Sequence, residues 1–331
     1  MATLKLGGPV DILVVTGLTL PAISDEQVAE IRAAASPGST VRVANGLRNA
    51  VEVAGDAEII LGYIPEPLFN AAPKLRWVHA IASGVDAFLY PAMKQSPVLL
   101  TGEKGLVGGH LADTGFGLLL SLTRQIKRAV TLGPDAWAQR EAMRKVEVEL
   151  EGLTMGIIGF GGAGRAMARR AVAFGMDVLA VDAWEVPPSD GVASVWPMHR
   201  LDELLAGADV VAICCPLSPE TREMMNDETF GRMKPGAYLV NVTRGEIVDG
   251  DALVRALESG HLGGAALDVA PGEPLPADHP LFRFENVAMT PHTAGASQLR
   301  APRNIARFCE NLRRARAGQP LVGLVDKELG Y

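Results

Sequence analysis

The stretch "GFGGAGRAMARR" at residues 159–170 decides the fold, because a turn rich in glycine passes directly into a helical pattern. It follows the apolar run "TMGII", which is typical of a buried strand. Gly159, Gly161 and Gly164 form the pattern Gly-x-Gly-x-x-Gly. In such a turn the first glycine makes the tight bend, the second lets backbone approach a pyrophosphate, and the third lets the helix pack on the strand. The sequence therefore predicts a bound dinucleotide at the N-terminus of this helix.

A carboxylate follows the turn at the distance that such a site needs. Asp182 ends the next apolar run, "DVLAVD", 18 residues after Gly164. There it can accept hydrogen bonds from both ribose hydroxyls and repel a 2′-phosphate, so we expect NAD rather than NADP as the cofactor. Gly162 and Ala163, at the start of the helix, are expected to add contacts to the cofactor. The alternative is that Asp182 only caps a turn before Trp184.

Short β-rich runs alternate with helical patterns on both sides of residue 104. The alternation predicts an α/β fold with two Rossmann-like, doubly wound parallel sheets, the second larger than the first. Ser24 is expected to cap the first helix. We also expect one apolar helix over 109–130 and a final amphipathic helix over 297–316 that needs a surface to pack on. The predicted strands cover 11–16, 40–44, 58–63, 75–81, 98–102, 153–160, 177–182, 209–215, 237–242, 263–269 and 287–292.

The composition is typical of a globular protein and disfavours nucleic acid and membranes as partners. Of the 331 residues, 48% are hydrophobic and 21% are charged, and the net charge is −7. An acidic chain disfavours a phosphate backbone or an anionic membrane surface, since both attract basic faces. The sequence contains no signal-peptide pattern and no run of about 18 apolar residues. Cys214, Cys215 and Cys309 match neither a disulfide framework nor a metal-ligand spacing, so we expect a cytoplasmic protein without a metal site.

Seven motifs occur in a fixed order along the chain. They are "ASGVD" (82–86), "LADTGFGLLL" (111–120), the glycine turn, "CCPLSPET" (214–221), "VNVTRGEIVDGDALVRAL" (240–257), "GGAALDVAPGEPLP" (263–276) and "TPHTAGAS" (290–297). With these motifs the sequence resembles the D-isomer-specific 2-hydroxyacid dehydrogenases, a family of NAD(P)-dependent enzymes. The resemblance extends over about residues 58 to 297.

The resemblance implies that a dinucleotide-binding domain is inserted into a discontinuous substrate-binding domain. We expect the substrate-binding domain at 1–103 and 295–331, and the NAD-binding domain at 104–294. This arrangement explains why the glycine turn lies almost halfway along the chain. It also explains the helix that follows the last strand. In the family, the segment that corresponds to the region around Trp137 grips a second subunit, so the resemblance also implies a homodimer.

The resemblance assigns catalysis to Arg244, Glu273 and His292. Reduction of a 2-oxo acid requires that its carboxylate is anchored, that its carbonyl is polarised and that a proton reaches the carbonyl oxygen. The planar guanidinium of Arg244, at the end of a strand, can hold the carboxylate and the carbonyl together. His292 matches the family's acid/base histidine. Glu273 matches its carboxylate partner, which orients the ring and favours its protonated form.

Further residues are assigned to the two ligands. Backbone N–H groups of Ser83, Gly84 and Val85 can form an anion-binding nest for the substrate carboxylate. Tyr63 lies near the end of a neighbouring strand and could line the substrate pocket. By resemblance, Asp268 faces the nicotinamide carboxamide. The remaining cofactor contacts are expected from Pro216, Thr221 and Thr243.

These residues predict an oxidoreductase that transfers hydride between NAD(H) and a small 2-oxo acid such as glyoxylate or hydroxypyruvate. A second hypothesis is an NAD(H)-sensing, corepressor-like binding protein of the same fold with incidental turnover. A third hypothesis keeps the enzyme but makes formate or phosphite its substrate. Glu273 disfavours formate, because formate enzymes of this architecture carry an amide at that position. No basic residue adjoins the "ASGVD" turn, so unphosphorylated acids are favoured.

Overall fold

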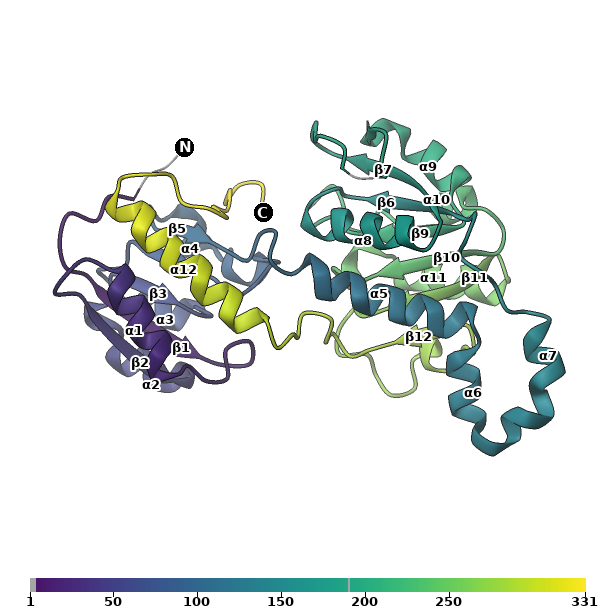
Figure 1. The fold of residues 1–331 in the computed structure, drawn as a ribbon, viewed down its shortest axis with the longest axis horizontal. Coiled ribbons are helices and arrows are strands. Elements are labelled where there is room, and N and C mark those ends of the chain that lie inside the picture. The colour runs from purple at the N-terminus through teal and green to yellow at the C-terminus, as the bar shows by residue number, and fades with distance from the viewer. Residues whose placement is uncertain (1–3, 190) are drawn as a thin grey trace. The chain divides into compact units, whose positions relative to one another are not determined.

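The computed structural model describes residues 4–189 and 191–331, and the chain divides into two compact units (Figure 1). The first unit comprises Met1–Leu106 and Ala296–Tyr331, and the second comprises Val107–Gly295. Each is an α/β domain around a parallel sheet, with five strands in the first unit and seven in the second. The predicted fold class is therefore confirmed. No helix within the described residues is long and apolar enough to cross a membrane.

The first unit is built on a sheet of strand order β2-β1-β3-β4-β5. Its helices cover both faces of this sheet, which gives the unit two separate buried clusters. The strands are β1 (Asp11–Thr16), β2 (Thr40–Asn45), β3 (Ile59–Leu61), β4 (Trp77–His79) and β5 (Leu99–Thr101). The helices are α1 (Asp25–Ala34), α2 (Gly46–Val53), α3 (Glu66–Asn70), α4 (Pro91–Gln95) and α12 (Arg300–Arg316).

The last helix, α12, packs on the first unit beside α1 (Figure 1). Ile31 of α1 and Phe308 of α12 join Trp77 of β4 in one buried cluster. The ring centroids of Trp77 and Phe308 are 5.0 Å apart. At the start of α1 the Ser24 hydroxyl accepts a hydrogen bond from the Gln27 N–H at 3.2 Å, which confirms the predicted cap. The surface that the final amphipathic helix requires is therefore provided by the N-terminal third of the chain.

The second unit is built on a sheet of strand order β12-β11-β10-β9-β6-β7-β8. The short edge strand β8 has no counterpart among the predicted strands. The strands are β6 (Thr154–Ile158), β7 (Asp177–Asp182), β8 (Val195–Pro197), β9 (Val210–Ile213), β10 (Ala237–Asn241), β11 (Leu262–Leu267) and β12 (Val287–Met289). The helices are α5 (Gly108–Thr123), α6 (Ile126–Leu132), α7 (Arg140–Arg144), α8 (Gly162–Ala173), α9 (Leu201–Gly207), α10 (Asp227–Arg232) and α11 (Gly250–Glu258).

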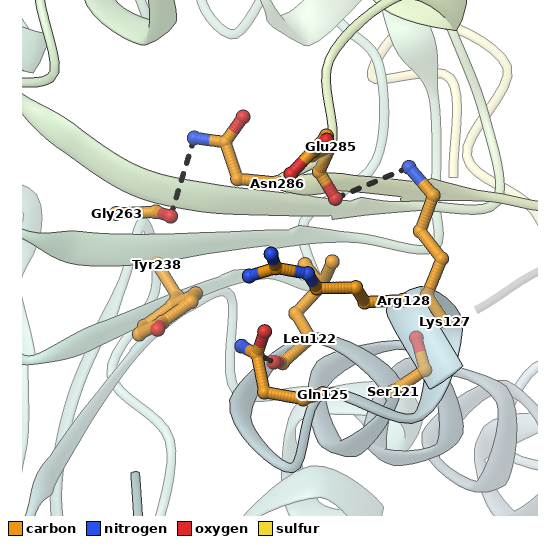
Figure 2. A pocket seen from close by; sticks show the side chains of 9 residues that line it. All are labelled: Ser121, Leu122, Gln125, Lys127, Arg128, Tyr238, Gly263, Glu285 and Asn286. Carbon is orange, nitrogen blue, oxygen red and sulfur yellow. Dashed lines mark hydrogen bonds between the residues drawn. The ribbon is translucent and has the colours of Figure 1, made fainter. Parts of the chain in front are cut away.

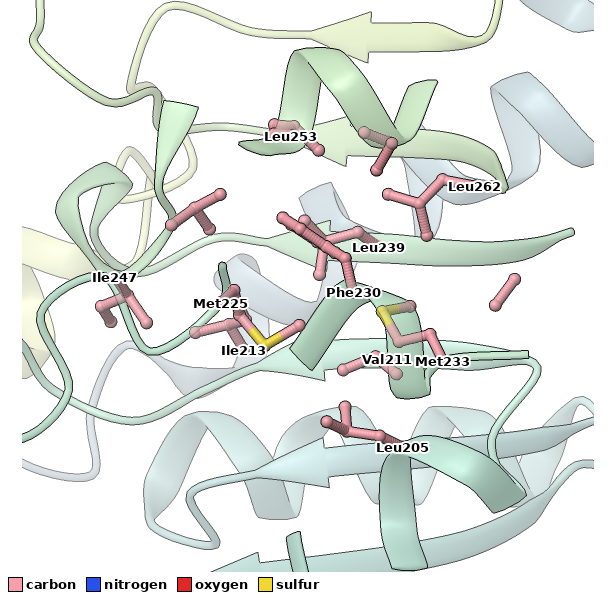
Figure 3. Close-up of a cluster of buried hydrophobic side chains, with 14 of the residues drawn as sticks. Leu205, Val211, Ile213, Met225, Phe230, Met233, Leu239, Ile247, Leu253 and Leu262 are labelled. Atoms are coloured by element: carbon pink, nitrogen blue, oxygen red, sulfur yellow. The ribbon is translucent and has the colours of Figure 1, made fainter. Parts of the chain in front are cut away.

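Helices cover both faces of the second sheet as well. On one face, Leu205 of α9, Phe230 of α10 and Leu253 of α11 meet buried side chains of β9 and β10 (Figure 3). On the other face, Phe116 of α5 and Met167 of α8 belong to a second buried cluster. Because both faces are covered, the strands are almost wholly apolar, as buried parallel strands are. Polar site residues can therefore come only from the segments at the strand ends.

The prediction of one continuous helix over 109–130 is wrong, because two helices occupy this segment. Helix α5 ends at Thr123 and α6 begins at Ile126, and Gln125 between them has a left-handed backbone with φ of +54°. Lys127 of α6 donates hydrogen bonds to the carbonyls of Phe284 at 2.8 Å and Glu285 at 3.2 Å. Figure 2 shows this lysine beside the segment that precedes β12. A tertiary contact thus redirects a sequence whose apolar pattern alone continues as a helix.

Candidate active site

The predicted cofactor and catalytic residues of the second unit follow strands that all end at one edge of its sheet. The chain winds from β6 to β7 on one side and returns to β9 on the other, so the topology switches between β6 and β9. Ligands of doubly wound folds bind beyond the carboxyl ends of the strands at such a point. The structure therefore gathers these residues where a ligand is expected. They are Gly159, Gly161, Gly162, Ala163 and Gly164 after β6, Asp182 at the end of β7, Pro216 and Thr221 after β9, Thr243 and Arg244 after β10, Asp268 and Glu273 after β11, and His292 after β12.

The glycine turn has three different steric environments. Gly159 has φ of +92°, and a Cβ there would lie 2.6 Å from the Cα of Cys215. A Cβ on Gly164 would lie 2.1 Å from the Gly159 carbonyl oxygen. A Cβ on Gly161 would meet no atom within 4 Å. The first and third glycines are therefore required by the protein's own packing, whereas the second faces open space. That open side, at the N-terminus of α8, fits a dinucleotide pyrophosphate.

Asp182 is held close to the glycine turn. Its Oδ2 accepts a hydrogen bond from the Phe160 N–H at 2.6 Å, and its Oδ1 accepts one from the Trp184 N–H at 3.0 Å. The second contact is the turn cap considered as the alternative role for this residue. The two roles are compatible, because a carboxylate has about four lone-pair sites and two remain for ribose hydroxyls.

Side-chain hydrogen bonds shape the loops after β9 and β10. The Thr221 hydroxyl donates to the Pro216 carbonyl and accepts from the Ser218 N–H, both at 2.7 Å. The Thr243 N–H donates to Asn241 Oδ1 at 3.1 Å. Thr221 and Asn241 therefore fix the backbone of these loops, whatever contacts they make with a ligand. The sequence assigned no role to Ser218 or Asn241.

His292 and Glu273 form a hydrogen-bonded pair. His292 Nδ1 lies 2.7 Å from Glu273 Oε2, while Glu273 Oε1 accepts from the Ala270 N–H at 2.9 Å. The His292 side chain is 46% exposed, and its Nδ1 is the ring nitrogen that faces Glu273. The His292 backbone is left-handed, with φ of +53°. Such a conformation persists in a non-glycine residue only where the surroundings hold it, and it is common at functional sites.

Asp268 holds the loop that carries His292. It is 1% exposed, and its carboxylate accepts hydrogen bonds from the Thr290 hydroxyl at 2.6 Å and from the N–H groups of Thr293 and Ala294 at 2.9 and 3.0 Å. Its backbone carbonyl accepts from the His292 N–H at 2.8 Å. These contacts surround the left-handed residue on both sides. Asp268 thus has a structural role in addition to the cofactor contact that the resemblance implies.

Arg244 lies at the turn that follows β10. Its guanidinium donates to the Thr243 carbonyl at 2.8 Å, and its own carbonyl accepts from the Asn241 side chain at 2.9 Å. A Cβ on the next residue, Gly245, would lie 2.0 Å from the Ala270 carbonyl oxygen. The turn that carries Arg244 is therefore packed directly against the segment that leads to Glu273.

The predicted substrate residues of the first unit also follow adjacent strands. Tyr63, after β3, is 43% exposed, and its ring meets that of Phe88 edge to face at 5.3 Å. Ser83, Gly84 and Val85 follow β4. Among the residues that the structure describes, none accepts a hydrogen bond from the backbone N–H groups of these three residues. Val85 is 2% exposed, so its side chain belongs to the core of the first unit.

The three cysteines are free and buried. Burial raises the pKa of Cys215 to about 12 and that of Cys309 to about 11, which keeps both as thiols. In the described ranges no group of three or more His, Cys, Asp or Glu side chains is placed to hold a metal ion. The cavity drawn in Figure 2, of about 140 Å³, lies at the opposite ends of the strands of the second sheet, where β10 and β11 begin. None of the predicted site residues lines it.

This edge of the second sheet suits a dehydrogenase that uses a dinucleotide, since a phosphate-binding turn and an acid/base pair lie beyond the same strand ends. Comparison with known proteins defines the class further. Residues 116–294 match the family model described as "D-isomer specific 2-hydroxyacid dehydrogenase, NAD binding domain". The chain belongs to the D-isomer-specific 2-hydroxyacid dehydrogenase family, as its motifs predicted. It is an oxidoreductase of that family with an NAD(P)-binding domain.

Individual relatives agree with this assignment. The chain is 34% identical over 288 residues to a glyoxylate reductase of Korarchaeum cryptofilum, covering 84% of this chain and 86% of that protein. It is 32% identical over 284 residues to a hydroxypyruvate reductase of Blautia hydrogenotrophica, covering 82% and 86%. Among solved structures, a D-isomer-specific 2-hydroxyacid dehydrogenase from Xanthobacter autotrophicus in complex with NADPH and MES aligns over 100% of both chains, with 29% identity and a TM-score of 0.77.

Proposed function

We propose that the protein reduces a small 2-oxo acid to the D-2-hydroxy acid, with glyoxylate or hydroxypyruvate as the first candidates. The observation that carries this proposal is the pair formed by His292 and Glu273, 2.7 Å apart and open to solvent, at the same sheet edge as the glycine turn. Relatives named glyoxylate reductase and hydroxypyruvate reductase support the choice of substrate.

The chain's own residues supply positioning and proton transfer. His292 delivers a proton to the substrate's carbonyl oxygen during reduction and takes it back during oxidation. Glu273 accepts the hydrogen bond from Nδ1, which fixes the ring so that Nε2 faces the substrate. Arg244 holds the substrate carboxylate and polarises the carbonyl. The N–H groups of Ser83, Gly84 and Val85 bind the carboxylate as a nest, and Tyr63 lines the pocket.

The cofactor in this proposal is NADH. It supplies the hydride, and the open side of the turn at Gly161 fits its pyrophosphate. We propose NAD over NADP because the Asp182 carboxylate, held at the end of β7, repels a 2′-phosphate. Gly162, Ala163, Pro216, Thr221 and Thr243 add contacts from the same edge. Asp268 both anchors the histidine loop and faces the nicotinamide carboxamide.

We further propose a cytoplasmic homodimer. The cysteines are unpaired thiols, which suits a reducing compartment. In α6 and the segment after it, Val130 is 77% exposed and Trp137 is 79% exposed. Large apolar side chains at this exposure suit a surface that a second copy of the chain covers. Sedimentation velocity of wild type and of Trp137→Ser tests this, and a monomeric wild type contradicts it.

The direct test follows NADH oxidation with a panel of 2-oxo acids, using wild type, His292→Ala and His199→Ala. His199 is an exposed histidine of the same unit and serves as the control. We expect kcat for the best acid to fall by a factor of about 100 or more in His292→Ala, the usual contribution of general acid catalysis, and to be unchanged in His199→Ala. NADH binding should persist in both variants. Tight NADH binding by wild type with no turnover of any acid would overturn the reductase proposal in favour of an NAD(H)-sensing protein.

A further inference from the structure

A network of hydrogen-bonded, buried polar side chains runs through the first unit. The Trp77 indole N–H donates to the Thr101 hydroxyl at 2.9 Å, and Thr101 lies 2.7 Å from His79 Nδ1. His79 Nε2 lies 2.9 Å from Asn304 Oδ1, and the Asn304 amide donates in turn to Glu103. These five side chains are almost fully buried.

The Glu103 carboxylate can only accept, so the Asn304 amide N–H faces it and Asn304 Oδ1 faces His79 Nε2. With Nε2 as the donor, Nδ1 of a neutral ring accepts from the Thr101 hydroxyl, whose oxygen also accepts from Trp77. Burial lowers the pKa of His79 to about 4, which is consistent with this neutral ring. The amide of Asn304 has only its N–H to offer to Glu103. The hydrogen-bonded network therefore ends at an acceptor, the Glu103 carboxylate.

An arginine from α12 completes the cluster. Arg300 Nε donates to Glu103 Oε1 at 2.9 Å and Nη2 donates to Oε2 at 2.6 Å, which is a two-point contact. The Glu103 side chain is 0% exposed and that of Arg300 is 14% exposed. Glu103 comes from the segment after β5, so the ion pair joins parts of the chain that are 197 residues apart.

The cluster is bonded directly to the segment that leads into the "ASGVD" turn. The Glu103 N–H donates to the Ala82 carbonyl at 3.0 Å, and Arg300 Nη2 lies 3.4 Å from the Ile81 carbonyl. The Ala82 carbonyl is thus held by the Glu103 backbone, and the Ile81 carbonyl is held by the Arg300 side chain, which the two-point contact with the Glu103 carboxylate keeps in place. The Ser83 N–H lies in the same peptide plane as the Ala82 carbonyl, so fixing that carbonyl orients the first donor of the nest formed by Ser83, Gly84 and Val85.

We propose that Glu103 and Arg300 are positioning residues that preorganise the 83–85 turn for the substrate carboxylate, an inference that rests on the proposed function. Burying an ion pair costs desolvation energy, and apolar residues of similar volume often stabilise a fold at least as well. A pair that only filled space would therefore gain nothing from its charges. Precise placement of backbone donors is what a rigid two-point contact can add.

The test compares Glu103→Gln with Asp11→Asn. Asp11 pairs with Arg42 in the same unit at the start of β1, and its side chain is 20% exposed, so this control breaks an ion pair away from the turn. Arg300→Lys is the milder variant, because lysine keeps the charge but lacks the planar fork. Glyoxylate and NADH are the probes, and hydrogen exchange of the amide of residue 103, whose N–H is bonded to the Ala82 carbonyl, is measured in every variant by mass spectrometry.

We expect Glu103→Gln to raise KM for glyoxylate by about tenfold with a smaller change in kcat, as loss of uniform substrate binding does. Arg300→Lys should show a smaller rise in the same direction. Affinity for NADH should stay at the wild-type value, and exchange of the amide of residue 103 should be faster than in Asp11→Asn. The proposal is overturned if the Glu103→Gln and Asp11→Asn proteins have the same KM and the same exchange at residue 103. Should wild type reduce no 2-oxo acid, the proposed function fails, whereas the exchange comparison still decides whether the pair orders the turn.

Discussion

Two alanine substitutions in the glycine turn are expected to separate folding from cofactor binding. At Gly161 the backbone, with φ of −78°, suits any residue, and an added Cβ meets no atom within 4 Å. At Gly164 an added Cβ would lie 2.1 Å from the Gly159 oxygen, whereas ordinary contact begins at 3.4 Å. The same methyl group therefore enters open space at one position and protein backbone at the other.

The expected effects on stability have opposite signs. Gly161→Ala restricts the unfolded chain and should raise the free energy of unfolding by about 0.5 kcal/mol. Gly164→Ala must displace the backbone of the turn and should lower it by about 3 kcal/mol, at the upper end of the usual range for overpacking. For a domain of this size, that loss corresponds to a fall in Tm of about 6 to 12 °C.

Cofactor affinity is expected to change in the stabilised variant. The alanine methyl at position 161 would occupy the side of the turn where the pyrophosphate binds, so Kd for NADH should rise at least about tenfold, which is 1.4 kcal/mol. Calorimetric titration with NADH and thermal unfolding measure the two quantities. Gly117→Ala is the matched control, since its Cβ also meets no atom within 4 Å and it lies in α5. If Gly161→Ala binds NADH as tightly as wild type, the pyrophosphate does not lie against this turn and the reasoning is refuted.

Three further predictions concern the cofactor, pH and the thiols. Asp182→Asn should raise the kcat/KM ratio of NADPH to NADH about tenfold, because it removes charge repulsion worth about 1.4 kcal/mol, and an unchanged ratio contradicts the role of this carboxylate. The pKa of His79 is about 4 in the folded protein and 6.5 ordinarily, so its contribution to stability is complete above pH 6.5 and is lost as the pH falls towards 4. Urea unfolding should therefore show a loss of about 3 kcal/mol over that range that is missing in His79→Gln. Burial raises the pKa of Cys215 to about 12, so thiol reagents at pH 8 should label it only on unfolding, and rapid labelling of the native protein contradicts this.

The fold was largely predictable because buried parallel strands form short apolar runs that helical patterns separate. Strand β8 lacks this signal, since it is three residues long, ends in Pro197 and lies partly exposed at the sheet edge. The break at Gln125 could not be predicted either. Its neighbours continue the helical pattern, and the lysine contact that redirects the chain involves residues near 285.

The candidate site likewise contains residues that the sequence predicts and residues that it does not predict. Residues within local motifs, such as the glycine turn and the histidine after "TP", can be proposed from the sequence because spacing along the chain carries the signal. Glu103 and Arg300 cannot, since their pairing depends on α12 packing across the first sheet. The role of Asp268 in holding the 290–294 loop could not be predicted from the sequence either. A carboxylate at a strand end has the same sequence pattern whether it binds a ligand or holds a loop such as 290–294.

During synthesis the ribosome completes the second unit before the first, although the first begins earlier. The face of α1 and β4 that Phe308 covers in the finished protein must wait while Val107–Gly295 emerges. Loop closure across this insertion costs little at equilibrium, because its entropy grows only with the logarithm of length. The consequence is kinetic instead. Until α12 packs on it, the apolar face of the first unit stays uncovered and is a target for aggregation and for chaperones. The nascent chain is therefore most vulnerable just before α12 leaves the ribosome.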